Sequence, residues 1–205
     1  MILKKKTACI LMASGYASRF GKNKLLTEFQ GKSLFQITLD SLPLDDFCGV
    51  FTVTQYPELE QLSTLYGIPT VRNPMESPEL CDTIRIGTQA ARKLAPEGIM
   101  YCVCDQPLRT RTSLLRMIRL FEENPDRIVA LSWNGKKGNP IIYPSGVFDE
   151  LEHLSGTQSG SSVLKKHPEL LLLCPADREL EMLDVDTAED FLRLNQQSVS
   201  SSPLH

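Results

Sequence analysis

The stretch ILMASGYASRFGKNKLL, residues 10–26, begins as an apolar strand and continues as a charged loop. The apolar run 8–13 stops at the small pair Ser14-Gly15, and the cations Arg19 and Lys24 follow at some distance from each other. Small residues let backbone N–H groups approach phosphate oxygens. Arginine offers a planar fork of donors, and lysine offers a compact charge. The stretch therefore predicts a loop that binds a nucleoside triphosphate.

Two common phosphate-binding motifs fit this loop poorly. A P-loop reads G-x-x-x-x-G-K-[ST]. Here five residues separate Gly15 from Gly21, and Lys22 is followed by Asn23, which lacks the hydroxyl that would hold Mg²⁺. The dinucleotide fingerprint G-x-G-x-x-G does not occur anywhere in the sequence. We therefore favour neither motif.

The composition is that of an ordinary globular protein. The 205 residues are 41% hydrophobic and 23% charged, which suffices for one domain with a sizeable core. A net charge of −3 argues against a nucleic-acid partner, because duplex binding needs a basic surface. We expect neither a secretory signal nor a membrane span, since the apolar runs are too short.

The cysteines and histidines do not suggest a zinc site. Six cysteines occur without a C-x-x-C pair, and the chain has three histidines. Most of the cysteines lie in or beside apolar runs, where a free thiol behaves as a small hydrophobe. We expect reduced cysteines in a cytoplasmic protein.

Strand-like and helix-like segments alternate along the first 132 residues. Alternation of this kind predicts a three-layer, doubly wound α/β fold, with a mostly parallel sheet and helices on both faces. The segment 80–94 repeats apolar residues at helical spacing, and Thr112 or Ser113 can cap the fourth helix. The expected strands are 7–13, 49–54, 69–72, 98–104 and 127–132, and the expected helices are 33–42, 57–66, 80–94 and 112–123.

The last third of the chain has a different rhythm. Residues 133–136 predict a tight hairpin turn before an extended segment at 139–143. Short helices are expected at 147–154 and 161–167, a strand at 170–174 and a final helix at 187–195. We expect a single domain over residues 1–195 and a disordered serine-rich tail over 196–205.

A second candidate site follows the fourth expected strand, in the tetrapeptide Cys104-Asp105-Gln106-Pro107. Ligands of open α/β sheets bind beyond the carboxyl ends of the strands. If the first and fourth strands are close, Asp105 faces the Ser14-Gly15 loop. A carboxylate there could hold Mg²⁺ between a triphosphate and an attacking group. The alternative is an ordinary strand-end turn, but together with the loop the metal site is favoured.

The loop resembles the signature LAAG-x-S-x-R-x-G-x-x-K-L of MobA-like nucleotidyltransferases, and within them the molybdenum-cofactor cytidylyltransferases most closely. Met12 and Ser14 depart from it. The resemblance spans residues 7 to about 194 and implies a nucleotide-diphospho-sugar transferase-like, Rossmann-like fold. The positions that match the signature are Leu11, Ala13, Gly15, Ser18, Arg19, Gly21, Lys24 and Leu25.

Four further segments resemble motifs of the same family. YCVCDQP resembles its G-D-Q-P, K-G-N-P resembles R-G-N-P, Asn73-Pro74 with 82–87 resembles N-P and S-S-L-R-x-G, and LDVDTAED resembles L-D-I-D-T-P-E-D. The last segment also contains a helix-capping signal at Asp186, Thr187 and Asp190. That signal leaves Asp184 without an explanation, and Asp184 is therefore the expected second metal ligand, with Asp186 as the alternative.

The resemblance implies a reaction and a set of site residues. A phosphate on molybdopterin attacks the α-phosphorus of CTP in line, pyrophosphate leaves, and Mg²⁺ assists. A molybdenum hydroxylase or its chaperone is the further partner. The implied catalytic residues are Lys24, Arg19 and Asp105; the nucleotide-binding residues are Ala13, Ser14, Gly15, Arg19, Lys24, Asn73 and Arg85; the acceptor-binding residues are Gln106, Gly138, Asn139 and Pro140; and the metal ligands are Asp105 and Asp184.

One departure leaves the acceptor open. Thr157 stands where the cytidylyltransferases carry the Asp of S-G-D, and Ser161-Ser162 stands where they carry an Arg. Two alternatives therefore remain: transfer to a sugar or polyol phosphate, and a non-catalytic nucleotide- or cofactor-binding accessory protein for molybdenum hydroxylases. The presence of Lys24, Arg19 and Asp105 argues against the accessory protein. The Ala13-Ser14-Gly15 run, where the guanylyl branch has Gly-Gly, favours CTP over GTP.

Overall fold

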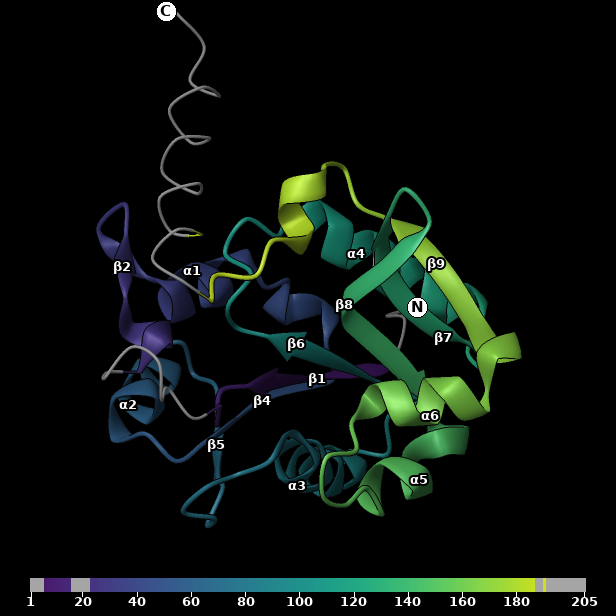
Figure 1. Cartoon of the computed structure of the whole chain (residues 1–205), viewed down its shortest axis with the longest axis horizontal. Coiled ribbons are helices and arrows are strands. Elements are labelled where there is room, and N and C mark those ends of the chain that lie inside the picture. Colours follow the sequence, from purple (N-terminus) through teal and green to yellow (C-terminus); the bar gives the residue numbers. More distant parts are fainter. Residues whose placement is uncertain (1–5, 16–22, 187–189, 191–205) are drawn as a thin grey trace, which may run out of the picture.

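The computed structural model describes residues 6–15, 23–186 and 190. A seven-stranded sheet runs through the molecule in the order β5-β4-β1-β6-β8-β7-β9 (Figure 1). Its strand pairs are parallel except for the two that β8 makes with β6 and β7. The strands are β1 (Thr7–Met12), β4 (Gly49–Thr54), β5 (Thr70–Arg72), β6 (Gly98–Val103), β7 (Ile128–Trp133), β8 (Lys136–Pro144) and β9 (Leu171–Pro175).

Helices cover both faces of this sheet. In Figure 1, α3, α5 and α6 lie on one side of the sheet, and α1 and α4 lie on the other. Leu59 of α2 packs in the same core cluster as α1 and α4. The helices are α1 (Leu34–Ser41), α2 (Pro57–Leu65), α3 (Leu80–Arg92), α4 (Arg111–Glu123), α5 (Phe148–Glu152) and α6 (Gly160–Lys166).

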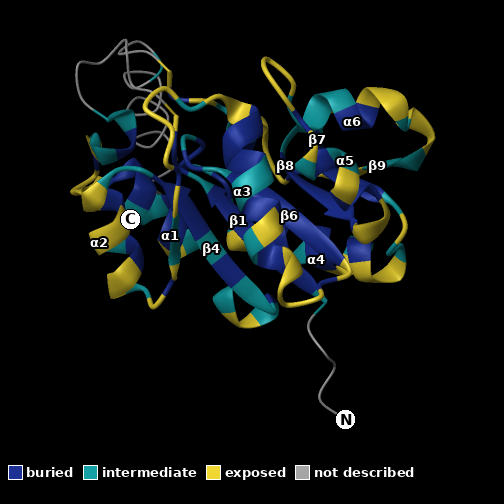
Figure 2. Cartoon of the chain, turned by 90° about the horizontal axis from the view of Figure 1, so that it is seen from below, coloured by how far each residue is buried: buried dark blue, intermediate teal, exposed yellow. Residues whose placement is uncertain are grey.

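The two faces follow from the two-residue period of the strands. Cys9 and Leu11 of β1 pack in the cluster that contains Phe121 of α4. Ile10, which points to the other face, packs in the cluster that contains Ile84 of α3. The strands are mostly buried, and the helices expose their outer faces (Figure 2). The predicted three-layer, mostly parallel α/β fold is confirmed.

Several element boundaries differ from the sequence-based expectation. Helix α4 begins after Thr110, whose hydroxyl accepts a hydrogen bond from the backbone N–H of Ser113 at 3.2 Å, so the predicted cap at Thr112 or Ser113 was wrong. The helix expected at 147–154 is shorter, since the 3-10 helix η3 (Ser145–Val147) precedes α5 and α5 ends at Glu152. A small hairpin, β2 (Glu28–Phe29) with β3 (Lys32–Ser33), was not predicted. Nearly all of the final helix expected at 187–195, and the whole tail 196–205, lie outside the described residues.

The hairpin turn expected at 133–136 is present. Asn134 and Gly135 join β7 to β8 with positive φ angles of 47° and 77°, the conformation that two-residue hairpin turns require. This turn sends β8 back antiparallel between β7 and β6. It therefore carries the segment 138–144 into the middle of the sheet.

The described part of the chain contains no helix long and apolar enough to cross a membrane. All six cysteines are described, and each is a free thiol. Five of them are buried, and Cys48 is half-buried.

The sheet order brings the two expected site loops together. Strands β1 and β6 are hydrogen-bonded neighbours, and their last residues, Met12 and Val103, lie opposite each other. The Ser14-Gly15 loop and Asp105 therefore leave the sheet side by side at the same edge.

A close contact between β6 and α4 gives a test of this packing. A Cβ added at Gly98 would overlap the buried ring of Phe121. We expect Gly98→Ala to lower the free energy of unfolding by about 1–3 kcal/mol, because the ring must move within a close-packed core. The measurement is the urea midpoint. Gly146→Ala is the matched control, since a Cβ there meets nothing within 4 Å, and its midpoint should stay at the wild-type value. Equal midpoints for both variants would contradict this account of the contact.

Candidate active site

One lysine and two carboxylates meet at the carboxyl edge of the sheet. The Nζ of Lys24 lies 2.7 Å from Oδ2 of Asp105 and 2.6 Å from Oδ1 of Asp186. Lys24 opens the 3-10 helix η1 (Lys24–Leu26), Asp105 follows β6, and Asp186 lies near the end of the described chain. The fold thus brings together three groups that are far apart in the sequence.

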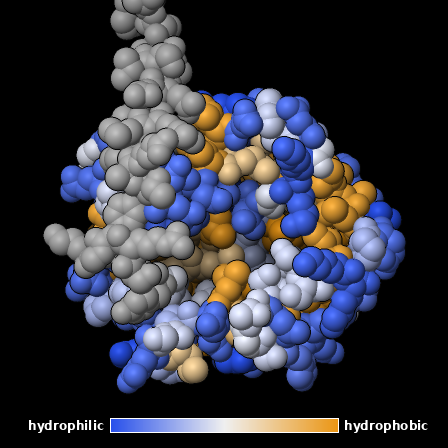
Figure 3. Space-filling view, in the orientation of Figure 1, coloured by the Kyte–Doolittle hydropathy of each residue, from blue (hydrophilic) through white to orange (hydrophobic). Residues whose placement is uncertain are grey.

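A pocket of about 250 Å³ opens beside this cluster. Three of the predicted nucleotide-binding residues, Ser14, Gly15 and Lys24, line it together with the predicted metal ligand Asp105. Its opposite wall comes from the start of α3 and the residues before it, 78–80 and Thr83. In Figure 3 the viewed face is hollowed near its centre, with apolar residues around the hollow and mostly hydrophilic residues beyond them.

The start of the loop is fixed to strand β4. The hydroxyl of Ser14 donates to the carbonyl of Val53 at 3.0 Å, and the N–H of Ala13 donates to the same oxygen at 3.0 Å. The hydroxyl of Thr54 in turn donates to the carbonyl of Ala13 at 2.9 Å. Because the Ser14 hydroxyl is used within the sheet, its backbone is what remains for a phosphate, as a small-residue loop requires.

The acidic C-terminal segment is tied to the turn that contains Asp105. The N–H of Val185 donates to the carbonyl of Asp105 at 3.0 Å, and Nε2 of Gln106 donates to Oδ1 of Asp184 at 2.8 Å. Gln106, predicted to bind the acceptor, therefore orients a carboxylate. These bonds place residues 184–186 beside the Asp105 turn.

Glu181 anchors the turn that leads into residues 184–186. Its carboxylate is fully buried and accepts hydrogen bonds from the N–H and hydroxyl of Thr110, both at 3.0 Å, and from the N–H of Asp177 at 2.9 Å. Charged acceptors with several donors are the strong kind of hydrogen bond. Glu181 therefore holds the turn before Asp184 against the start of α4.

We expect Glu181→Gln to lower the free energy of unfolding by about 1–3 kcal/mol, because an amide NH₂ replaces an oxygen that now accepts hydrogen bonds. Chemical denaturation measures the change. Glu179→Gln, an exposed position in the same turn, serves as the control and should match the wild type. A Glu181→Gln protein as stable as the control would argue against the anchoring role.

The charges at the site perturb one another. The pKa of Lys24 is raised: desolvation alone would lower it, but the charge of Asp105 and the hydrogen bonds that the ammonium donates to Asp105 and Asp186 outweigh that effect. Desolvation raises the pKa of Asp184, and the nearby carboxylates of Asp105 and Asp186 raise it further. Carboxylates therefore outnumber cations at this site: within the described residues, the Lys24 ammonium lies among three of them, Asp105, Asp184 and Asp186.

The donor set fits a divalent cation at Asp105. Its Oδ1 is buried and has no hydrogen-bond partner in the structure, and Oδ2 already holds an ammonium cation. Carboxylate oxygens are what Mg²⁺ and Mn²⁺ prefer. No group of three Asp, Glu, His or Cys side chains converges on one point in the described parts of the chain. Asp184 accepts a hydrogen bond from Gln106 and Asp186 accepts one from Lys24, so the choice of second ligand stays a prediction.

Four of the predicted nucleotide-binding residues are not among the described residues that line the pocket, and the buried Ala13 is one of them. Arg19 lies outside the described residues. Arg85 pairs with Asp82 on α3 at 2.6 Å. The buried Asn73 accepts a hydrogen bond from the N–H of Met75 at 3.1 Å. Asn73 and Arg85 thus shape the segment that leads into α3, and their direct contact with a nucleotide stays a prediction.

A second pocket of about 120 Å³ adjoins the first, with which it shares Met12, Leu80 and Val103. Asn139 lines it, next to a cis peptide bond to Pro140. Gly138 is packed against Met182 instead, which leaves no space for a side chain.

The sequence did not predict that Tyr101 and Tyr143 line this second pocket. Asn139, Ile141 and Tyr143 line the same side of β8, and Tyr101 lines it from β6. The two-residue period of the extended segment could have revealed that these β8 residues share a face.

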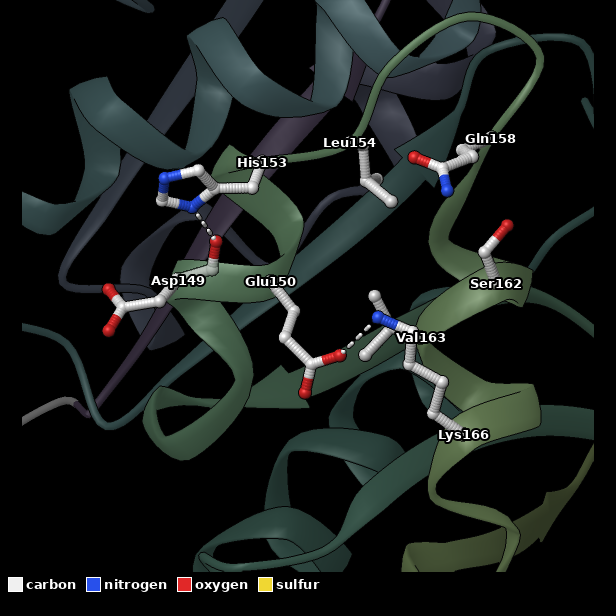
Figure 4. Close-up of a pocket in the computed structure, with 8 residues that line it drawn as sticks. All are labelled: Asp149, Glu150, His153, Leu154, Gln158, Ser162, Val163 and Lys166. Carbon is white, nitrogen blue, oxygen red and sulfur yellow. Dashed lines mark hydrogen bonds and ion pairs between the residues drawn. The ribbon is translucent and has the colours of Figure 1, made fainter.

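A third hollow lies between α5 and α6, away from the carboxylate cluster (Figure 4). Its charged groups engage one another or the backbone: Lys166 pairs with Glu150 at 3.0 Å, and Nδ1 of His153 lies 2.6 Å from the carbonyl of Asp149. It shares no lining residue with the other two pockets. We assign no chemistry to it.

Comparison with known proteins places this architecture among nucleotidyltransferases. Residues 9–170 match the MobA-like NTP transferase domain. Purine catabolism protein PucB of Bacillus subtilis (strain 168) is 23% identical over 193 residues, which cover 89% of this chain and 92% of PucB.

Solved structures of two other proteins share the fold. Rv0371c of Mycobacterium tuberculosis H37Rv superposes with a TM-score of 0.80 at 23% identity, covering 93% of this chain and 98% of that one, and its complex with manganese does so with a TM-score of 0.69 at 21% identity and the same coverage. A CMP:2-keto-3-deoxy-manno-octonic acid synthetase complexed with CTP has a TM-score of 0.72 at 12% identity, covering 96% and 100%.

Proposed function

We propose a reaction for this chain, which belongs to the MobA-like NTP transferase family: transfer of CMP from CTP to the phosphate of molybdopterin, with release of pyrophosphate. Nucleotidyl transfer is the activity of the family. The observation that carries the assignment is the ammonium of Lys24 between Asp105 and Asp186, beside a pocket that begins at the Ser14-Gly15 loop.

The protein's task in this reaction is to position two anions and to neutralise charge. A phosphate of the acceptor attacks the α-phosphorus in line with the departing pyrophosphate, so no covalent protein nucleophile is needed. Lys24 would exchange one of its carboxylate contacts for an α- or β-phosphate oxygen. Arg19 is proposed to neutralise the leaving pyrophosphate.

A divalent cation would be held by Asp105, with Asp184 or Asp186 as a further ligand. When bound, it would supply positive charge at the phosphate oxygens. We propose Mg²⁺, and the manganese complex of Rv0371c supports a divalent cation of this kind.

CTP is proposed as the donor and molybdopterin as the acceptor. The Ala13-Ser14-Gly15 run favours CTP over GTP. The synthetase of the same fold that was crystallised with CTP supports the fit of a cytidine nucleotide to this architecture. PucB is named for purine catabolism, and we propose a molybdenum hydroxylase or its chaperone as the partner that receives the product.

The test is pyrophosphate release with Mg²⁺ and each of CTP, GTP, UTP and ATP, with and without molybdopterin. Release with CTP only when molybdopterin is present is the expected result. Release with CTP and a sugar or polyol phosphate, but not with molybdopterin, would replace the acceptor. Nucleotide binding without pyrophosphate release from any donor would favour the accessory-protein alternative. Thr157, which stands where the cytidylyltransferases carry an Asp, is the sequence feature that supports this alternative.

A further inference from the structure

The second pocket differs in charge from the pocket of Lys24 and Asp105. The described residues that line it include no Asp, Glu, Lys, Arg or His. Its walls are apolar and aromatic, and its polar groups are the amide of Asn139 and the hydroxyls of serine and tyrosine side chains. A charged group placed here would lose its hydration without gaining a counter-charge. The pocket is therefore suited to an uncharged occupant.

Two tyrosines at this pocket stand in different hydrogen-bonding states. Tyr101 and Tyr143 pack edge to face, with ring centroids 5.7 Å apart. The hydroxyl of Tyr101 lies 2.6 Å from that of Thr88 and is satisfied within the core. Tyr143 is only 2% exposed, and its hydroxyl has no hydrogen-bond partner in the structure. A buried hydroxyl without a partner is costly, which points to a partner that arrives with a ligand.

A glycine makes room for this hydroxyl. A Cβ at Gly160 would lie 2.5 Å from the hydroxyl oxygen of Tyr143, closer than any side chain tolerates. Gly160 does not have a positive φ, so its backbone conformation does not require glycine. The absence of a side chain at this pocket-lining position therefore lets the Tyr143 hydroxyl lie where it does.

We propose that this pocket receives the end of the acceptor that is remote from its phosphate, that this end is an uncharged ring carrying a hydrogen-bonding group, and that the hydroxyl of Tyr143 recognises that group. The inference rests on the proposed function, because it assumes that the phosphate of the acceptor lies toward Lys24 and Asp105. The shared wall of Met12, Leu80 and Val103 joins the two pockets and gives one molecule a route into both. Tyr143 thereby becomes a determinant of acceptor specificity.

Two nearly isosteric probes test the charge preference. The first is 4-carbamoylphenyl phosphate, whose far end is neutral, and the second is 4-carboxyphenyl phosphate, whose far end is an anion. Binding to the full-length protein is measured by calorimetry without nucleotide, so the result does not depend on transfer or on the identity of the donor. We expect the amide to bind at least about tenfold more tightly, a difference of about 1.4 kcal/mol. Equal or tighter binding of the carboxylate, or no binding of either probe, would overturn the proposal.

Substitution at Tyr143 tests the role of the hydroxyl. Tyr143→Phe should weaken binding of the amide probe about tenfold, leave that of phenyl phosphate unchanged, and keep or raise the melting temperature, because a buried unpaired hydroxyl is removed. Tyr66→Phe, which removes a surface hydroxyl bonded to Asp40, is the matched control and should bind all three probes like the wild type.

Unchanged amide affinity in Tyr143→Phe would refute the role of the hydroxyl. Gly160→Ala provides a second variant, which should also weaken binding of the amide probe because its Cβ would displace the Tyr143 hydroxyl. A failure of the proposed function would appear in the pyrophosphate assay alone and would leave this binding comparison intact.

Discussion

Asp105→Asn is expected to reduce nucleotidyl transfer about a thousandfold or more while the fold persists. The substitution keeps the shape of the side chain but removes the charge that would hold a divalent cation, and the buried Oδ1 has no other partner to lose. Removing one charged group that acts on the developing phosphate charge costs about 10²–10³ in rate, and loss of the cation adds to that. The measurement is kcat for pyrophosphate release, with the melting temperature recorded alongside.

Metal-free binding distinguishes this role from a structural one. In the presence of a chelator, Asp105→Asn should bind CTP as well as the wild type or better, because an anion has left the neighbourhood of the triphosphate and Lys24 has lost a competing partner. Asp46→Asn, a surface carboxylate 3.8 Å from Arg111, is the control and should retain full activity. An active Asp105→Asn protein would remove Asp105 from the metal site.

Lys24→Met is expected to lower kcat for transfer about a hundredfold to a thousandfold and to weaken CTP binding as well. A charge-assisted hydrogen bond to a phosphate is worth about 1.5–3 kcal/mol, and each 1.4 kcal/mol gained only in the transition state is tenfold in rate. The variant also leaves Asp105 and Asp186 without their common cation, so both would repel the triphosphate. Steady-state kinetics and CTP titration together measure the two effects.

Two companions sharpen this experiment. Lys24→Arg should not restore activity, because a planar guanidinium cannot take the place of a compact ammonium between two carboxylates. Lys32→Met, at a surface lysine paired with Asp40, should behave like the wild type. Wild-type transfer by Lys24→Met would contradict the assignment of Lys24 to the phosphates.

The sequence predicted the fold because its signals are local. An apolar run such as 98–103 predicts a buried strand, and a segment with apolar residues at helical spacing, such as 80–92, predicts a helix with one buried face. Because strands and helices alternate along the chain, few sheet topologies remain possible. Thr110 was missed as a helix cap because Thr112 and Ser113 offer the same hydroxyl chemistry two and three residues later. Capping depends on the backbone angles of the residue, which the residue type alone does not determine.

The sequence predicted the positions of those site residues that directly follow a strand. It did not predict contacts between segments that are far apart in the chain. Ser14, Gly15 and Asp105 follow buried strands that turned out to be neighbours, so their positions followed from the topology. The pairing of Asp186 with Lys24 depends on how the last segment crosses the sheet edge, which no local pattern encodes. Arg85 had an acidic neighbour three residues earlier, and on one face of a helix that neighbour is its partner.

The position of Asp186 in the chain sets when the site can exist. Its partner Lys24 leaves the ribosome 162 residues earlier, and the turn with Asp105 leaves midway between them. Every strand of the large sheet has been synthesised by residue 175, yet Asp186, the second carboxylate that binds Lys24, has not been synthesised at that stage. Synthesis therefore supplies every strand of this sheet before the second carboxylate, and the cluster around Lys24 forms only when the short acidic segment docks at the edge of the sheet.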